Sequence, residues 1–180
     1  MSRLRLFFVG VLSALAVVAA PAGAGTGHDG VRSVSSRASL DRAILVEINA
    51  LRTSRGLRPV VQSAPLADAA RSHSFEMARI GYFAHDSASG STFTQRVQGF
   101  YASSGYRSWR AGENLLWASP DVSAKQALEL WRKSPEHRKI LFAPGWRDIG
   151  VSAVHTPAGP RAFDGLAVTI VTANFGARVR

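Results

Sequence analysis

The sequence predicts an α+β fold in which helices pack on both faces of a small, mainly antiparallel sheet. Three observations lead to this prediction. Apolar residues recur with helical spacing in three long segments, 40–55, 65–80 and 121–133. The C-terminal part contains two strand-like segments separated by a loop rich in proline and glycine. The expected order of helix, helix, short helix, strand, helix, strand, strand is typical of layered α+β domains.

Residues 1–24 have the pattern of a secretory signal peptide. Arg3 and Arg5 precede an uncharged apolar stretch, and small residues at its end resemble a cleavage site. The alternative is a membrane anchor, but the stretch is shorter than the about 20 residues that a span needs. Residues 25–39, rich in glycine and serine, predict a flexible mature N-terminus, and residues 40–180 one domain. We therefore expect a secreted or extracellular protein with no transmembrane segment in its mature chain.

The composition limits the chemistry that the chain can perform. It contains no cysteine, which excludes disulfides, thiolate metal ligands and a cysteine nucleophile. The formal net charge is +10, carried mostly by arginines that are spread along the chain. Nucleic-acid-binding proteins usually gather such charge on one face, so no nucleic-acid partner is expected. The basic surface is interpreted either as ordinary solvated surface or as attractive to anionic cell-wall polymers or lipid headgroups.

Three helices are expected in the first half of the domain, each with a recognisable start. The expected helices are 40–55 with Ser39 as N-cap and Gly56 after its end, 65–80 beginning at Pro65 and ending at Gly81, and 92–100. His73 falls on the apolar face of the second of them. A single histidine in such a position is more often a packed, hydrogen-bonded core residue than a ligand, and we interpret His73 in that way.

The second half is expected to contain the sheet and one long helix. The expected elements are a strand over 111–117, a helix over 121–133 introduced by Ser119-Pro120, a helical turn introduced by Ser134-Pro135, and strands over 149–153 and 166–175 joined by a loop over 156–165. The last strand is apolar at most positions, as expected for a strand that is covered on both faces. No internal repeat or second domain is evident.

Three residues stand out as candidates for function: His85, Glu113 and His137. Glu113 lies at the mouth of an apolar strand, where a carboxylate must find a partner or have its pKa raised by desolvation. The structural alternative is an ordinary ion pair with a nearby arginine such as Arg110. If Ser134 caps its turn, His137 lies at a positive helix end that favours a neutral imidazole. His85 follows an aromatic pair and would otherwise be a surface loop histidine.

Two imidazoles and a carboxylate from three segments can hold a divalent metal ion with open positions for water. They can also bind the polar head of a substrate or activate a water molecule. Their spacing is not that of a local H-E-x-x-H motif, so the sequence by itself does not establish a metal site. Ser-His-Asp catalysis is less supported, because none of the many serines lies in a G-x-S-x-G turn.

At these residues the chain resembles the CAP superfamily of cysteine-rich secretory proteins, antigen 5 and pathogenesis-related class 1 proteins. The bacterial secreted branch, also called SCP-like, is the closer match. The resemblance covers residues 40–177 and depends on short motifs that occur in the right order. They are 49–52 with 56–57, 70–77, 82–85, 112–115, 131 with 134–138, and 149–151.

The resemblance implies a three-layer α-β-α sandwich with a large cleft lined by two histidines and two glutamates. In some members of the family these residues bind zinc or another divalent cation. Carried over to this sequence, His85 and His137 match the two histidines and Glu113 matches one glutamate. The place of the second glutamate is held by Ser134, and Glu136 is the candidate substitute. The disulfides of the eukaryotic members have no counterpart here.

Three hypotheses for function follow. The first is an extracellular or cell-wall-associated binding module that takes a lipid or a small wall-derived ligand. Such a module could bind its ligand with or without a divalent cation. The second is a metal-assisted, protease-like extracellular hydrolase with Glu113 as general base. The third is a structural wall-associated protein that acts through its basic surface. The first is preferred, because the fourth acidic residue is missing and no nucleophile is evident, so enzymatic activity stays an open question.

Overall fold

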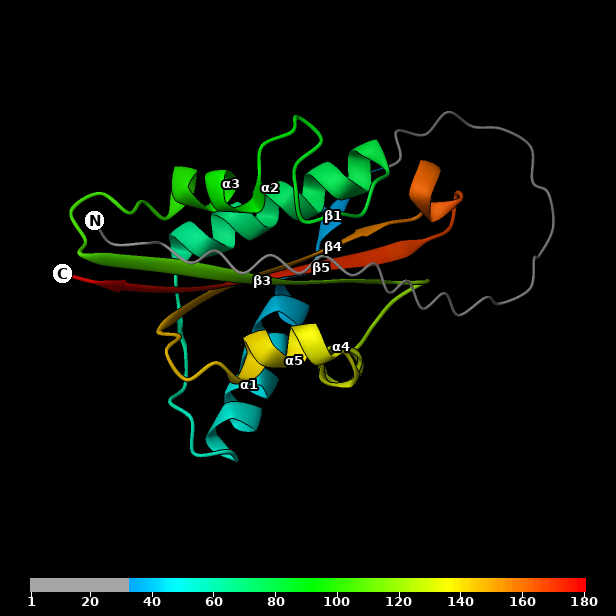
Figure 1. Cartoon of the computed structure of the whole chain (residues 1–180). Coiled ribbons are helices and arrows are strands. Elements are labelled where there is room, and N and C mark those ends of the chain that lie inside the picture. Colours follow the sequence, from blue (N-terminus) through cyan, green and yellow to red (C-terminus); the bar gives the residue numbers. More distant parts are fainter. Residues whose placement is uncertain (1–32) are drawn as a thin grey trace, which may run out of the picture.

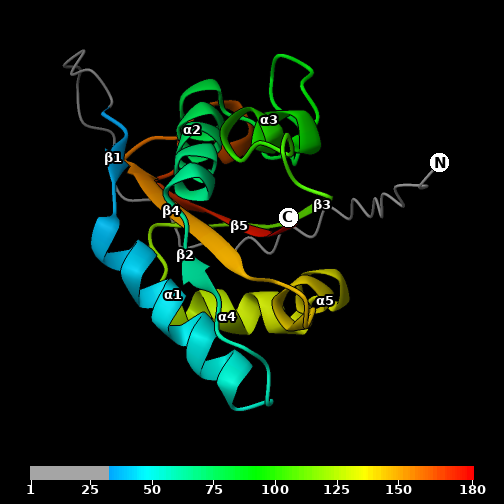
Figure 2. The same cartoon turned by 90° about the vertical axis from the view of Figure 1, so that its left-hand side faces the viewer.

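The computed structural model describes residues 33–180 as three layers (Figures 1 and 2). Helices α2 and α3 cover one face of the sheet, and α1, α4 and α5 cover the other. The predicted three-layer α+β sandwich is therefore confirmed. The helices are α1 (Ala38–Thr53), α2 (Ala64–Ile80), α3 (Phe93–Phe100), α4 (Ala124–Lys133) and α5 (Pro135–Phe142), with a short 3-10 turn over Arg161–Phe163.

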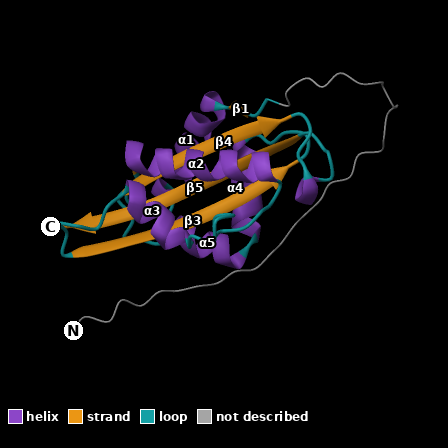
Figure 3. Cartoon of the chain, turned by 90° about the horizontal axis from the view of Figure 1, so that it is seen from above, coloured by secondary structure: helices purple, strands orange, loops and turns teal. Residues whose placement is uncertain are grey.

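The sheet is built around three long strands. The strands are β1 (Ser35–Ser36), β2 (Val61–Gln62), β3 (Ser108–Ala118), β4 (Asp148–Thr156) and β5 (Val168–Val179). Their order is β1-β4-β5-β3, and all of these neighbours pair antiparallel. Only β2 pairs parallel, with the first residues of β4. Figure 3 shows the long strands side by side, with β5 in the middle.

The core lies on both faces of the central strand β5. Toward α1 and α4 it contains Ile44, Ile48 and Trp131, all fully buried. Toward α2 it contains Met77 and Ile170, which are also fully buried. Burying each such side chain contributes about 1.5–3 kcal/mol. The unbroken apolar character of β5 follows from this double coverage, as the sequence predicted.

The N-terminal part of the described chain is ordered earlier than the sequence predicted. Ser35 and Ser36, within the segment expected to be flexible, pair with β4. Helix α1 then begins at Ala38, so Ser39 is its second residue and not its N-cap. The chain is held here because Arg37 N–H donates to Ala153 O at 2.9 Å. The signal peptide predicted for residues 1–24 lies outside the described residues.

Helix α4 and strand β3 also differ from their predicted bounds. The helix begins at Ala124 and not at residue 121, because Ser123 and Gln126 form a reciprocal capping box. Ser119-Pro120 therefore does not introduce it. Strand β3 begins at Ser108, three residues before its predicted start at 111, because these residues pair with the end of β5 as far as Val179. In residues 33–180, no helix has the length and apolar character needed to cross a membrane.

Candidate functional site

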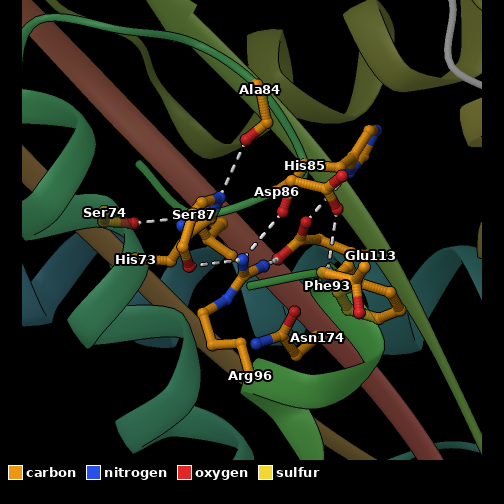
Figure 4. A network of polar contacts seen from close by, with 12 residues as sticks. His73, Ser74, Ala84, His85, Asp86, Ser87, Phe93, Arg96, Glu113 and Asn174 are labelled. Carbon is orange, nitrogen blue, oxygen red and sulfur yellow. Dashed lines mark hydrogen bonds and ion pairs between the residues drawn. The ribbon is translucent and has the colours of Figure 1, made fainter. Parts of the chain in front are cut away.

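The site lies where the loop after α2 meets strand β3 (Figure 4). Helix α2 ends at Gly81, which adopts the left-handed conformation (φ 80°) that a glycine tolerates best. The chain then turns and places His85 against Glu113 of β3. Arg96 of α3 approaches the same carboxylate from the other side. Segments far apart in the sequence thus meet at one carboxylate.

Glu113 is the centre of this arrangement. Its side chain is only 1% exposed. Oε1 accepts a hydrogen bond from His85 Nδ1 at 2.9 Å, and Oε2 accepts one from Arg96 Nη2 at 2.7 Å. Arg96 is itself 6% exposed, so the pair is buried and charge-compensated. The sequence predicted that the Glu113 carboxylate needs a partner, and in the structure Arg96 is that partner.

Asn174 of β5 completes the surroundings of the carboxylate. It lies directly opposite Glu113 in the β3–β5 pairing. With its amide nitrogen facing Glu113, it donates to Oε2 at 3.0 Å while its oxygen accepts from Ala70 N at 3.1 Å. This orientation satisfies both ends of the buried amide, whereas the opposite one places acceptor against acceptor. Glu113 is thus held by partners from three different elements.

The position of His85 follows from this network. Because a carboxylate can only accept, Nδ1 of His85 carries the hydrogen, and the lone pair of a neutral ring is on Nε2. The side chain is 39% exposed, in contrast to the buried carboxylate. Arg96 also donates to the backbone oxygen of His85 through Nη1 at 2.7 Å. The buried carboxylate of Glu113 therefore orients the imidazole through Nδ1, and the ring remains accessible to solvent.

His73 supports the loop that carries His85. It is fully buried, and its Nε2 donates to Ala84 O at 2.9 Å. Burial lowers the pKa of His73, in spite of the opposing effect of the Glu113 charge. Tyr82 donates to Glu76 and accepts from Ala88 N at 3.2 Å, which fixes the far side of the loop. The prediction that His73 is a packed, hydrogen-bonded residue is confirmed.

His137 occupies the first turn of α5. Ser134 is the N-cap, as predicted, and its hydroxyl accepts from His137 N at 3.4 Å. Asn114, next to Glu113 in β3, donates to His137 O at 3.1 Å. Burial is the main cause that lowers the pKa of His137, and the charge of His85 lowers it further. His137 is thus a half-buried imidazole that favours the neutral state and lies within electrostatic reach of His85.

The predicted residues are therefore brought together only in part. His85 and Glu113 are in direct contact, and His137 lies nearby. Glu136 instead pairs with Lys139, at 3.1 Å. Within residues 33–180, no three histidine, aspartate or glutamate side chains are grouped so that they could hold a metal ion. Glu113 does not fit as a metal ligand, because both of its oxygens accept hydrogen bonds and the side chain is shielded from solvent. The imidazoles of His85 and His137 have the ligand chemistry that zinc prefers. Metal binding stays a prediction.

A separate hollow of about 280 Å³ lies between α1 and α4, in the layer that also contains α5. Neither His85 nor Glu113 nor His137 contributes to its lining. Its lining combines apolar side chains with charged side chains of both signs. It is lined by Glu47, Ala50, Leu51, Ser54, Lys125, Leu128, Glu129 and Arg132.

The CAP family, whose description is the cysteine-rich secretory protein family, matches this chain over residues 45–175. The chain belongs to the CAP family. It is 30% identical over 137 residues to the uncharacterized protein YkwD of Bacillus subtilis, which covers 76% of this chain and 51% of YkwD. This CAP chain thus spans about half the length of that relative.

Solved structures place the CAP domain in the bacterial SCP-like branch. An extracellular protein containing an SCP domain from Bacillus anthracis has a TM-score of 0.58 and 27% identity, covering 77% of this chain and 40% of that one. An outer surface protein from Borrelia burgdorferi has a TM-score of 0.59 and 21% identity, covering 76% and 91%. The second likeness concerns the fold alone.

In this CAP domain, sequence reasoning missed Arg96 and Asn174. It considered Arg110 as the structural partner of Glu113, which is wrong, because the Arg110 guanidinium lies over Trp146, 5.1 Å from the ring centroid. One signal was available for Arg96. Arg96 follows Phe93 by three residues on a short helix, and residues three apart share one helix face. Arg96 therefore lies on the same side as the apolar Phe93, which faces the sheet. Asn174 gave no signal, since its role depends on the strand register.

Proposed function

We propose that this CAP domain is an extracellular binding module that holds a lipid or a small cell-wall-derived ligand at the surface carrying His85 and His137. One observation carries the proposal. The half-exposed imidazole of His85 is oriented by a buried carboxylate whose charge is already compensated by Arg96. Such an imidazole, when neutral, presents the lone pair of Nε2 outward, which suits recognition of a hydrogen-bond donor on a ligand or of a metal ion.

Glu113 is poorly placed to act as a general base. A general base must come within hydrogen-bond reach of the proton that it removes. The side chain is 1% exposed, and both of its oxygens accept hydrogen bonds from neighbouring side chains. A substrate proton would have to displace His85 or Arg96 before it met the carboxylate. This favours the binding module over the metal-assisted hydrolase.

A divalent cation is a plausible companion of the ligand. His85 Nε2 and the His137 ring are the donors that would hold it, and Glu113 would orient His85 from behind, as carboxylates often do for metal-bound histidines. When bound, the cation would attract an anionic oxygen of the ligand. The protein itself would supply only two imidazoles, so water and ligand atoms would complete the coordination.

The extracellular location has two supports. The apolar N-terminal pattern of residues 1–24 is typical of secretory signal peptides. The similar protein from B. anthracis is described as an extracellular protein. Detection of the tagged chain in culture supernatant, with its N-terminus sequenced, would test both export and the predicted cleavage after residue 24.

Zinc is the simplest probe of the histidine surface. Isothermal titration of zinc into the purified domain should show one site that is lost in His85→Ala and in His137→Ala. His155→Ala is the matched control, because His155 contacts Thr169 in a different part of the sheet. Binding that survives both substitutions, or that His155→Ala also abolishes, would exclude this surface as the cation site.

The ligand is best approached with defined probes. Native mass spectrometry should compare palmitate, phosphatidylglycerol and a peptidoglycan disaccharide-tetrapeptide, each with the wild type and with the His85→Ala/His137→Ala variant. A retained probe that the variant releases supports the binding module. Cleavage of the tetrapeptide or of a casein substrate that disappears in Glu113→Gln, with the variant still folded, would instead establish the hydrolase.

A further inference from the structure

Arginines that are scattered in the sequence gather at one end of the folded sheet. This end is formed by the start of β3, the start of β4 and the end of β5, and Figure 1 shows the first and last of these together at the left. We call the five side chains there the arginine end. They are Arg107, Arg110, Arg147, Arg178 and Arg180.

Backbone pairing fixes the neighbours within this end. Arg107 N donates to Val179 O at 2.8 Å, so Arg107 lies beside the last residues of β5. Arg147 N donates to Gly176 O at 3.0 Å. Arg110 pairs with Ala177 across the β3–β5 ladder. Paired strands lie about 4.8 Å apart, so these side chains rise from adjacent positions.

Positive charge outnumbers negative charge at the arginine end. None of its five side chains takes part in an ion pair within the described residues 33–180. The nearest acidic residue in the strands is Asp148, and its carboxylate already accepts a hydrogen bond from Tyr101. By contrast, Arg96, buried in the centre of the molecule, is paired with Glu113. The arginine end is therefore a concentration of positive charge in which no arginine forms an ion pair within the described residues.

Aromatic rings hold several of these guanidinium groups in place. Arg178 lies over the rings of Tyr101 and Tyr106, at 3.8 and 4.5 Å from their centroids. Arg110 lies over Trp146 at 5.1 Å. Stacking on a ring leaves the N–H edge of a guanidinium free, and that edge matches phosphate oxygens in a bidentate manner. Arg178 also donates through Nη1 to Ala102 O at 3.2 Å, and Arg147 donates through Nη1 to Trp146 O at 3.1 Å. The ring contacts and these single bonds pre-orient the guanidinium groups, whose other N–H donors have no hydrogen-bond partner within residues 33–180.

We propose that the arginine end binds an extended polymer of phosphate diesters, of the kind found in anionic cell-wall chains. A phosphate diester carries one negative charge per repeat and presents two free oxygens to a guanidinium fork. Five arginines from three neighbouring strands can contact successive repeats. This binding surface shares no residue with the His85 surface, and it acts through charge and shape without recognising a single small ligand.

The position of the arginines favours a flexible chain over a flat bilayer. Arg178 packs on the tyrosines of the α3 side, whereas Arg110 packs on Trp146 beside α5. The charge therefore wraps around both faces of the sheet end, and a planar membrane would meet only part of it. The exposed apolar residues available to enter a bilayer here are few, mainly Phe100 and Val179.

A nucleic acid is also a phosphodiester polymer, but the rings at this end do not favour it. Single-stranded nucleic acids need open aromatic faces on which bases stack. Tyr106 is covered by Arg178 and lies near Arg180, Tyr101 is buried, and Trp109 donates its ring N–H to Tyr101 O at 2.7 Å. The expected partner is therefore a polymer without bases.

The test measures binding of lipid-free poly(glycerol phosphate) by isothermal titration over a range of salt concentrations. Arg110→Gln/Arg178→Gln should weaken binding by about tenfold or more, and should reduce the slope of log K against log salt by about 1.4, because each lost contact removes about 0.7. The matched control is Arg42→Gln/Arg79→Gln, which removes the same charge elsewhere and includes an arginine stacked on a ring, Phe75. It should change the affinity by less than about twofold.

Because Arg178 also packs on Tyr101, a second variant guards against loss of folding. Arg107→Gln/Arg147→Gln replaces two exposed arginines and should weaken binding to a similar degree. Equal weakening by the control pair would overturn the proposal, because net charge alone would then explain binding. Tighter binding to phosphatidylglycerol vesicles at equal phosphate, or to a single-stranded oligonucleotide at equal charge, would also overturn it.

Discussion

Arg96 and Glu113 form an ion pair with an Nη2–Oε2 distance of 2.7 Å, and both side chains are almost completely shielded from water. Isolating such charges in the interior is costly, and their mutual attraction is favourable only while both partners remain. The pair joins α3 to β3, and through Glu113 it orients His85. Stability of the fold and orientation of the exposed imidazole are therefore linked at this one contact.

Removal of Arg96 should be strongly destabilising. Arg96→Met leaves Glu113 buried without a cation, which typically costs about 3–5 kcal/mol in the free energy of unfolding. The double variant Arg96→Met/Glu113→Gln should recover part of this loss. Urea denaturation measures each value. The control is Arg71→Met, whose partner Asp68 is exposed, and it should cost less than about 1 kcal/mol. Similar costs for the two single variants would contradict this account.

His137 should titrate below the ordinary histidine pKa of 6.5. Burial lowers its pKa first and the charge of His85 second. His85→Asn should raise the pKa of His137, which must still stay below 6.5, because burial is unchanged. The unfolded chain takes up this proton near 6.5 and the folded chain resists it, so stability falls as the pH drops from 6.5 through the lower folded pKa. NMR titration of the imidazole measures the shift, and an unchanged pKa in His85→Asn would show that the rings do not interact.

Asp41 should make the protein more stable in mild acid than at neutral pH. Burial raises the pKa of its carboxyl from 3.8 to about 6, although the hydrogen bond from Ala153 N opposes this shift. Protonation therefore favours the folded state, with the full gain below pH 3.8 and none above the folded pKa. Because the group is partly exposed, we expect an effect of about 1 kcal/mol. Asp41→Asn should remove this contribution from the stability profile measured by thermal unfolding between pH 4 and 7, and an unaltered profile would count against it.

Gly150 should be intolerant of a side chain. A methyl group there would lie 2.0 Å from Ala67 N and 2.1 Å from Leu66 C, both in the backbone of α2, which cannot move without leaving the sheet. Gly150→Ala should therefore cost about 3 kcal/mol or prevent folding. Gly99→Ala is the control, because a methyl group there meets nothing within 4 Å in the helix α3. It should stabilise the protein by about 0.5 kcal/mol, measured by urea denaturation.

Local sequence signals placed some elements closely and missed others. Helix α2 ends at Gly81, as predicted, and α3 covers the predicted segment except for Thr92, which is its N-cap. Both ends are placed closely because a left-handed glycine and a capping box act within a few residues. Strands β1 and β2 were missed because two residues cannot display a period. They exist only through pairing with β4. Arg52 gave no sign of being buried either, yet its Nη1 donates to Leu141 O at 2.7 Å.

The sequence by itself determined the α+β class, the order of the main elements and the three candidate residues His85, Glu113 and His137. These follow from periodicity, from caps and from a resemblance carried by short motifs, all of which are local. Only the tertiary structure decided that Arg96 neutralises Glu113 and that five scattered arginines meet at one end of the sheet. Both depend on strand register and helix packing, which bring together residues whose separation along the chain carries no signal of contact.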